Sequence, residues 1–182
     1  MADTSEQQEP AWEFLNATIE FLKDEKGVHL ETAIAATARM AGTYLFRSFG
    51  FELADAEAGQ AVLSDIANEK GPELVNILGG ILDANSITIE PSAVEQDSGS
   101  DHEPHLTFAE TQPKLEPLYD AIRNRNGLSY ENAAHAVAAA TAGLIIQGTS
   151  VLDLAIAFDI AVYGFIEGSK TMPFPLNSGT HN

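Results

Sequence analysis

The sequence contains no cysteine among its 182 residues, which excludes disulfides, thiolate chemistry and the usual structural zinc sites. Basic residues are also scarce, because 9 Lys and Arg stand against 27 Asp and Glu and give a formal net charge of −18. Such a charge repels phosphate backbones, so we expect no nucleic-acid partner. It favours attraction to a basic protein or a cation instead. A chain without cysteine does not require an oxidising compartment, and we expect a cytoplasmic protein.

The sequence also lacks an apolar run long enough to cross a membrane. In the apolar C-terminal part, the longest stretch without charge or His runs from Ala136 to Leu152, and Gly148-Thr149-Ser150 interrupts it. A spanning helix needs roughly 20 apolar residues, so we expect no membrane partner. Residues 1–10, MADTSEQQEP, lack the basic and apolar regions of a signal peptide. They are predicted to be a disordered acidic tail.

The common catalytic and nucleotide-binding motifs are missing from the sequence. Gly79-Gly80 lies in an apolar stretch without the Gly-Lys-Ser/Thr of a phosphate-binding loop. No Gly-x-Ser-x-Gly elbow is present, so a hydrolase of that kind has no visible nucleophile. We therefore expect no bound cofactor and a protein that binds rather than catalyses.

What the sequence does contain is helical pattern. Apolar residues between Trp12 and Lys26 recur at the spacing of an amphipathic helix. An alanine-rich segment, Leu30–Phe49, follows and stops at Gly50. Glycine and proline positions divide the remaining helices, which are predicted at Ala54–Glu69, Pro72–Asn85, Leu118–Arg125, Ser129–Gln147 and from Thr149 or Ser150 to Gly168.

The segment 90–117 differs from the rest of the chain in composition. It is rich in Pro and Glu, and its apolar periodicity nearly disappears, which predicts a linker or long excursion. It divides the chain into a helical unit at 11–89 and a second at 118–170, followed by a C-terminal tail at 171–182. The predicted helix Pro72–Asn85 has no counterpart in the second unit. We expect it to fill a groove between the units or to supply an oligomer contact.

The two units repeat one another weakly. FELADA at 51–56 resembles LDLAIA at 152–157, and GVHLETAIAA matches GLSYENAAHA at an offset of 100. The shared order indicates an internal duplication, with coincidence between alanine-rich helices as the alternative. The predicted fold is therefore an all-α bundle of six to eight helices, built as two related three-helix units packed about a pseudo-two-fold axis. Alanine and glycine on facing helices should allow close backbone contact.

Asp159 is the first candidate site residue. At helical spacing its neighbours include Ile156, Val162 and Tyr163, so a carboxylate there faces apolar groups. Such a residue is either a pocket acid with a perturbed pKa or a structural acid, paired with an arginine or placed at a rim. The arginines available for such a pair are Arg39, Arg47, Arg123 and Arg125.

Glu31, Glu131 and His135 are the other candidates. The two glutamates lie at equivalent places near the starts of the long helices. Under two-fold packing they would face each other and hold a divalent cation or share a proton, and otherwise they complement helix dipoles. His135 follows Glu131 by one turn, which is a weak metal signal, and the alternative is an ordinary half-buried histidine. DHEPH at 101–105 has metal-binding residue types, but its surroundings argue against a preorganised site. We expect no metal.

The leading functional hypothesis is a helical interaction or assembly module that forms a homo-oligomer, with a basic protein as a further partner. The alternative is a small-ligand binder or enzyme whose pocket lies between the units and uses Asp159, Glu31, Glu131 and His135. A pocket of about 300 Å³ or more that contains at least two of these groups would favour the alternative.

Overall fold

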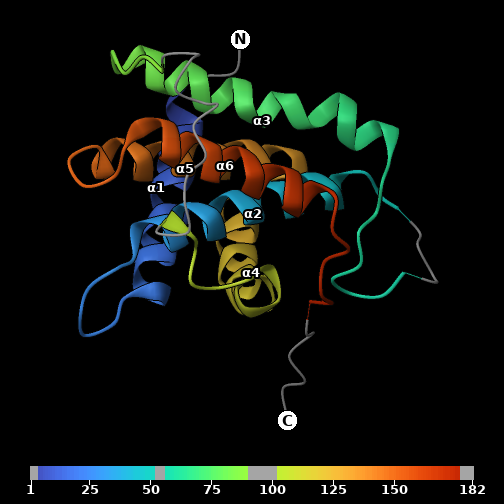
Figure 1. Ribbon diagram of the computed structural model, residues 1–182. Coiled ribbons are helices and arrows are strands. Elements are labelled where there is room, and N and C mark those ends of the chain that lie inside the picture. The colour runs from blue at the N-terminus through green and yellow to red at the C-terminus, as the bar shows by residue number, and fades with distance from the viewer. Residues whose placement is uncertain (1–3, 52–55, 90–101, 177–182) are drawn as a thin grey trace.

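The computed structural model describes residues 4–51, 56–89 and 102–176 (Figure 1). These residues form six α-helices and no β-strand, which confirms the predicted all-α bundle. The helices are α1 (Thr4–Leu22), α2 (Leu30–Ser48), α3 (Asp65–Ala84), α4 (Phe108–Arg125), α5 (Tyr130–Gly148) and α6 (Leu154–Ser169).

Helix α2 lies at the centre of the molecule and packs against each of the other five helices described. It is buried without interruption from Thr32 to Phe46, which explains why its sequence shows no polar face. Helix α3 runs along one edge of the bundle and α4 lies at the opposite edge (Figure 1). The core is therefore a single cluster to which α1, α2, α3, α4, α5 and α6 all contribute.

Helices α2 and α6 approach so closely that their backbones touch. A Cβ atom added to Gly42 would lie 2.5 Å from the carbonyl oxygen of Phe165 and 2.6 Å from the nitrogen of Ser169. One added to Gly164 would lie 2.7 Å from the Cβ of Ala38, and one added to Gly168 would meet the Arg39 carbonyl. Only glycine fits these positions, as expected for close contact between small-residue helices.

The long helices begin where local capping residues place them. The side chain of His29 accepts a hydrogen bond from the Thr32 amide at 3.4 Å, and that of Ser129 accepts from the Asn132 amide at 3.1 Å. Gly127, with φ of 62°, turns the chain before Ser129. These signals lie within a few residues, which is why the sequence predicts both helices to within a residue at each end.

The predicted break at Gly71-Pro72 is wrong, because α3 continues through it as one helix. Ser64 caps this helix by accepting from the Ala67 amide at 3.3 Å. Leu74, Leu78 and Leu82 are fully buried one turn apart, and their burial outweighs the cost of an internal proline. Among the described residues of the helix predicted at Ala54–Glu69, only those from Asp65 onward are helical, and they form the first part of α3.

The predicted linker 90–117 is helical over its last ten residues, where α4 begins at Phe108. The capping box of Thr107 and Glu110 starts the helix. Glu116, 1% exposed, receives hydrogen bonds from both Nε and Nη2 of Arg47, the latter at 2.8 Å. Burial raises the pKa of Glu116 above its ordinary value despite the opposing effect of Arg47.

Other predicted boundaries shift as well. Residues 4–10 of the predicted N-terminal tail belong to α1. In the predicted C-terminal tail, Phe174 donates to Gln112 Oε1 at 3.1 Å and its carbonyl accepts from Arg47. Residues 1–3, 52–55, 90–101 and 177–182 lie outside the described part, so most of FELADA and the start of the linker are not placed. The pseudo-two-fold packing of two units stays a prediction.

Candidate functional site

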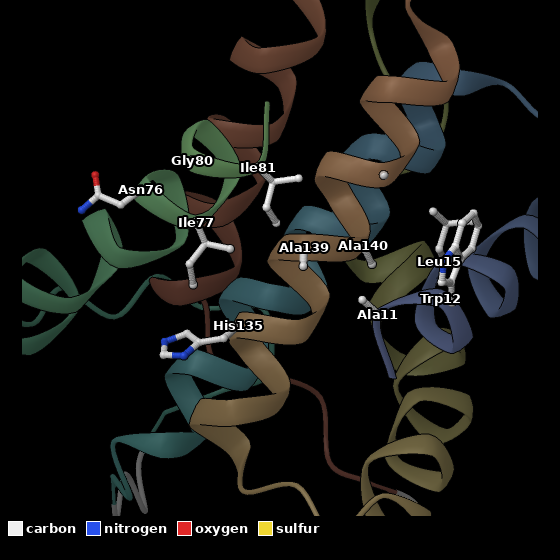
Figure 2. A pocket seen from close by; sticks show the side chains of 11 residues that line it. Ala11, Trp12, Leu15, Asn76, Ile77, Gly80, Ile81, His135, Ala139 and Ala140 are labelled. Carbon is white, nitrogen blue, oxygen red and sulfur yellow. The ribbon is translucent and has the colours of Figure 1, made fainter. Parts of the chain in front are cut away.

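A pocket of about 550 Å³ opens between α1, α3 and α5 (Figure 2). Helix α5 forms its floor, while α3 and α1 stand on opposite sides of α5. We call it the α1–α3–α5 groove, and it is lined by Ala11, Trp12, Leu15, Asn76, Ile77, Gly80, Ile81, His135, Ala139, Ala140 and Gly143. Its surface is therefore mostly apolar, with Asn76 and His135 as the polar residues of the lining.

The groove exists because its floor is made of small residues while α3 presents large ones. Ala139, Ala140 and Gly143 reach little above the α5 backbone, and Ile77 and Ile81 face them from α3. A Cβ added to Gly80 would meet no atom within 4 Å. The space is therefore not filled by any described part of the chain.

Polar groups gather at one end of the groove, where His135 points toward α3 (Figure 2). Its Nε2 atom is buried, lies 3.5 Å from Glu73 Oε2 and makes no hydrogen bond among the described residues. Lys70 Nζ lies 3.1 Å from Glu73 Oε1 and 3.4 Å from Glu131 Oε1. These carboxylates raise the pKa of Lys70. Glu131 and His135 thus share one face of α5, as their spacing predicts.

Glu31 lies elsewhere, at the start of α2. Its Oε2 atom is 3.4 Å from His29 Nε2 and its Oε1 atom is 3.3 Å from His102 Nδ1. His29 also stacks on His105, with ring centroids 3.6 Å apart. Burial raises the pKa of Glu31, but hydrogen bonds from its own backbone amide and from His102 more than offset this, so the pKa falls below its ordinary value.

Asp159 lines a second, smaller pocket of about 310 Å³ together with Arg39, His102 and Tyr163. Partial burial raises the pKa of its carboxyl. Within the described ranges the side chain of Asp159 makes no hydrogen bond or ion pair with another residue. The four arginines considered as its partners all pair elsewhere, in the pairs Arg39–Glu167, Arg47–Glu116, Arg123–Asp120 and Arg125–Glu13.

The structure therefore divides the four candidate residues between two places. His135 alone of the four lines the larger pocket, and Asp159 alone lines the smaller one. Glu31 and Glu131 contact different partners, histidines in one case and Lys70 in the other. Across residues 4–51, 56–89 and 102–176, no group of three or more His, Asp or Glu is placed to hold a metal ion.

Two important features were not predicted. Trp12 is 57% exposed at the edge of the groove, although its spacing to Leu15 places both on the apolar side of a helix. Glu116, which fixes α4 to α2, lies in a segment predicted as linker. In both cases the missing information is which helix packs on which face.

Neither family models, curated protein sequences nor solved structures give a match to this chain. None of the helices in the described ranges has the length and apolar character required to span a bilayer.

Proposed function

We propose that this chain is a non-catalytic helical assembly module that pairs with a second copy of itself through the outer face of α6. Tyr163 and Ile166 lie one turn apart on this face and are 70% and 48% exposed. Beside Ile166, an apolar groove of about 320 Å³ separates α6 from α3 and is lined by Ala67 and Val162 among others. Exposed apolar surface of this kind on a helix supports a protein contact.

The charge distribution supports a second copy as the partner at this face. Like charges repel, so two chains of net charge −18 associate best where carboxylates are fewest. Asp159 and Glu167 are the only Asp, Glu, Lys or Arg residues of α6, and Arg39 Nε holds Glu167 Oε2 at 2.6 Å. The proposal includes a cytoplasmic location, which suits a chain without cysteine.

The alternative, a small-ligand binder or enzyme, has weaker support. It requires a pocket that combines at least two of the four candidate residues. Of the four candidate residues, only His135 lines the larger pocket and only Asp159 lines the smaller one. The exposed apolar face of α6 is therefore the observation that carries the assembly proposal.

Sedimentation equilibrium from low to high micromolar concentration tests the proposal. We expect a dimer whose population rises with concentration and which Ile166→Glu removes. Val151→Glu is the control, because Val151 is an even more exposed apolar residue outside α6, at 79% against 48% for Ile166. A chain that remains monomeric throughout, or a dimer that survives Ile166→Glu, contradicts the proposal.

A further inference from the structure

The α1–α3–α5 groove has the length of a short helical contact. Its α5 floor extends from His135 to Gly143, which is about 12 Å at roughly 1.5 Å per residue. That length matches two turns of a second helix, whose side chains at helical spacing would enter between Ile77 and Leu15. A helix-in-groove contact of this type needs an apolar channel with walls on both sides, and α3 and α1 supply them (Figure 2).

Trp12 gives the groove a characteristic contact residue. It is the only tryptophan in the sequence and lies at the edge of the groove with more than half of its surface exposed. Tryptophan is enriched among the residues that contribute most to binding at protein interfaces. An amphipathic helix seated on α5 would cover its ring.

Carboxylates flank the apolar surface at both ends. On α3, Glu73, Asn76, Gly80 and Asp83 follow one another at helical spacing, so Glu73 and Asp83 lie along the face that borders the groove. Glu131 lies one turn before His135 on α5. Lys70 contacts both Glu73 and Glu131, and His135 Nε2 lies 3.5 Å from Glu73.

The buried Nε2 atom of His135 adds an unused hydrogen-bonding atom at the same end. The groove therefore combines an apolar centre, an exposed tryptophan and negatively charged ends. A second copy of this chain, with its charge of −18, would place like charges against these ends. A small apolar molecule would fill the centre but would bring no positive charge to the flanking carboxylates.

We propose that the α1–α3–α5 groove binds an amphipathic helix of another protein, with leucine-like side chains on one face and Lys or Arg at the positions that flank this face. The apolar side chains enter the space above Ala139 and Ala140. The basic side chains lie near Glu73, Asp83 and Glu131. This site is separate from the outer face of α6 and does not depend on self-assembly.

Trp12 emission reports binding directly. We expect a designed helical peptide with Leu at helical spacing and Lys elsewhere to shift the emission to shorter wavelength in a saturable manner, because the ring leaves water. A peptide with the same leucines and Glu in place of Lys should bind at least about tenfold more weakly. Added salt should weaken the binding of the basic peptide.

Two glycine variants separate groove binding from general attraction to an acidic protein. Gly80→Leu fills the groove, since nothing lies within 4 Å of its added Cβ, and should reduce the affinity for the basic peptide at least about tenfold. Gly79→Leu adds the same side chain to the same helix, also in open space, but does not line the groove. It should leave the affinity unchanged.

Four results would overturn the inference. One is equal binding of the two peptides, and another is equal binding by the Gly80→Leu and Gly79→Leu variants. The third is that neither peptide shifts the emission, while an uncharged apolar dye binds to the parent chain and not to the Gly80→Leu variant. That result would assign the groove to small molecules. The fourth is an emission shift caused by protein concentration alone, which would assign it to a second copy.

Discussion

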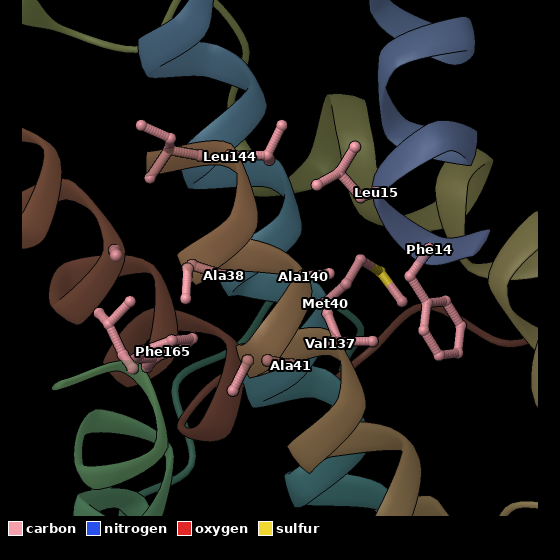
Figure 3. Packing of buried hydrophobic residues seen from close by; sticks show 14 of the residues in the cluster. Phe14, Leu15, Ala38, Met40, Ala41, Val137, Ala140, Leu144 and Phe165 are labelled. Atoms are coloured by element: carbon pink, nitrogen blue, oxygen red, sulfur yellow. The ribbon is translucent and has the colours of Figure 1, made fainter. Parts of the chain in front are cut away.

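Two helix interfaces of this chain both use glycine and alanine, yet only one of them is closed. Between α2 and α6, Gly42, Gly164 and Gly168 leave no space for a Cβ atom. Figure 3 shows α2, α5 and α6 meeting in one core, with Ala38, Val137 and Phe165 among the labelled side chains. Between α3 and α5, a Cβ on Gly80 would meet nothing and a groove remains.

In this chain, the backbones of α2 and α6 touch where both helices carry small residues. Helix α6 places glycines against the alanines and glycine of α2, so the backbones meet. Helix α3 places Ile77 and Ile81 against Ala139 and Ala140 of α5, and these side chains keep the backbones apart. The first interface is therefore closed, and the second keeps an open, mostly apolar groove beside the buried leucines of α3.

The largest expected loss of stability comes from removing a buried side chain that attaches α3 to the core. Leu78 is completely buried, so Leu78→Ala should lower the free energy of unfolding by about 3 kcal/mol through lost burial and a cavity. Ile77→Ala, one residue away at the groove wall, should cost about 1 kcal/mol because it is only partly buried. Urea unfolding followed by circular dichroism compares the two. Equal losses would mean that the groove wall is packed like the core.

A smaller effect compares one glycine of α2 with one glycine of α5. Gly42→Ala should lower stability by about 2 kcal/mol, because backbone atoms of Phe165 and Ser169 block the new Cβ. In Gly143→Ala the Cβ would meet only Leu15 Cδ1, at 2.9 Å, and that side chain can turn away. The gain in helix propensity should keep its effect within about 1 kcal/mol. Thermal unfolding measures the stability of both variants. An equal loss of stability in the two would contradict the comparison.

The smallest expected effect on stability comes from Asp159 of α6. Partial burial raises the pKa of Asp159, so its ionisation disfavours the folded state. Asp159→Asn should therefore be slightly more stable than the parent chain at neutral pH. The difference should vanish as the pH falls through the raised pKa, because the parent carboxyl then becomes neutral too. A variant that is less stable at neutral pH would show that the carboxylate has a partner that stabilises it.

The sequence predicts the fold class and the long helices well because their determinants are local. His29 and Ser129 cap α2 and α5 within one turn of the helix start. In contrast, Pro72 in α3 and Pro117 in α4 are breakers by local rules, and only packing of buried leucines and of Glu116 shows that the helices continue. Local signals cannot show which residues will be buried by a distant helix.

The candidate site is predicted only in part for the same reason. The spacing of Glu131 and His135 places both on one face of α5, and the structure places both beside α3. Asp159 and Glu31 lie apart from them near His102. The groove itself depends on the distance between α3 and α5, which no short stretch of sequence encodes.

The most direct test of the account replaces one glycine in each interface by alanine and compares the free energies of unfolding. Gly168→Ala should lose about 2 kcal/mol, because its Cβ would meet the Arg39 carbonyl and the Thr43 nitrogen. Gly80→Ala should raise the free energy of unfolding by up to about 1 kcal/mol, because the new methyl group enters empty space and alanine favours the helix. Changes of the same sign in both variants would contradict the contrast between a closed and an open interface.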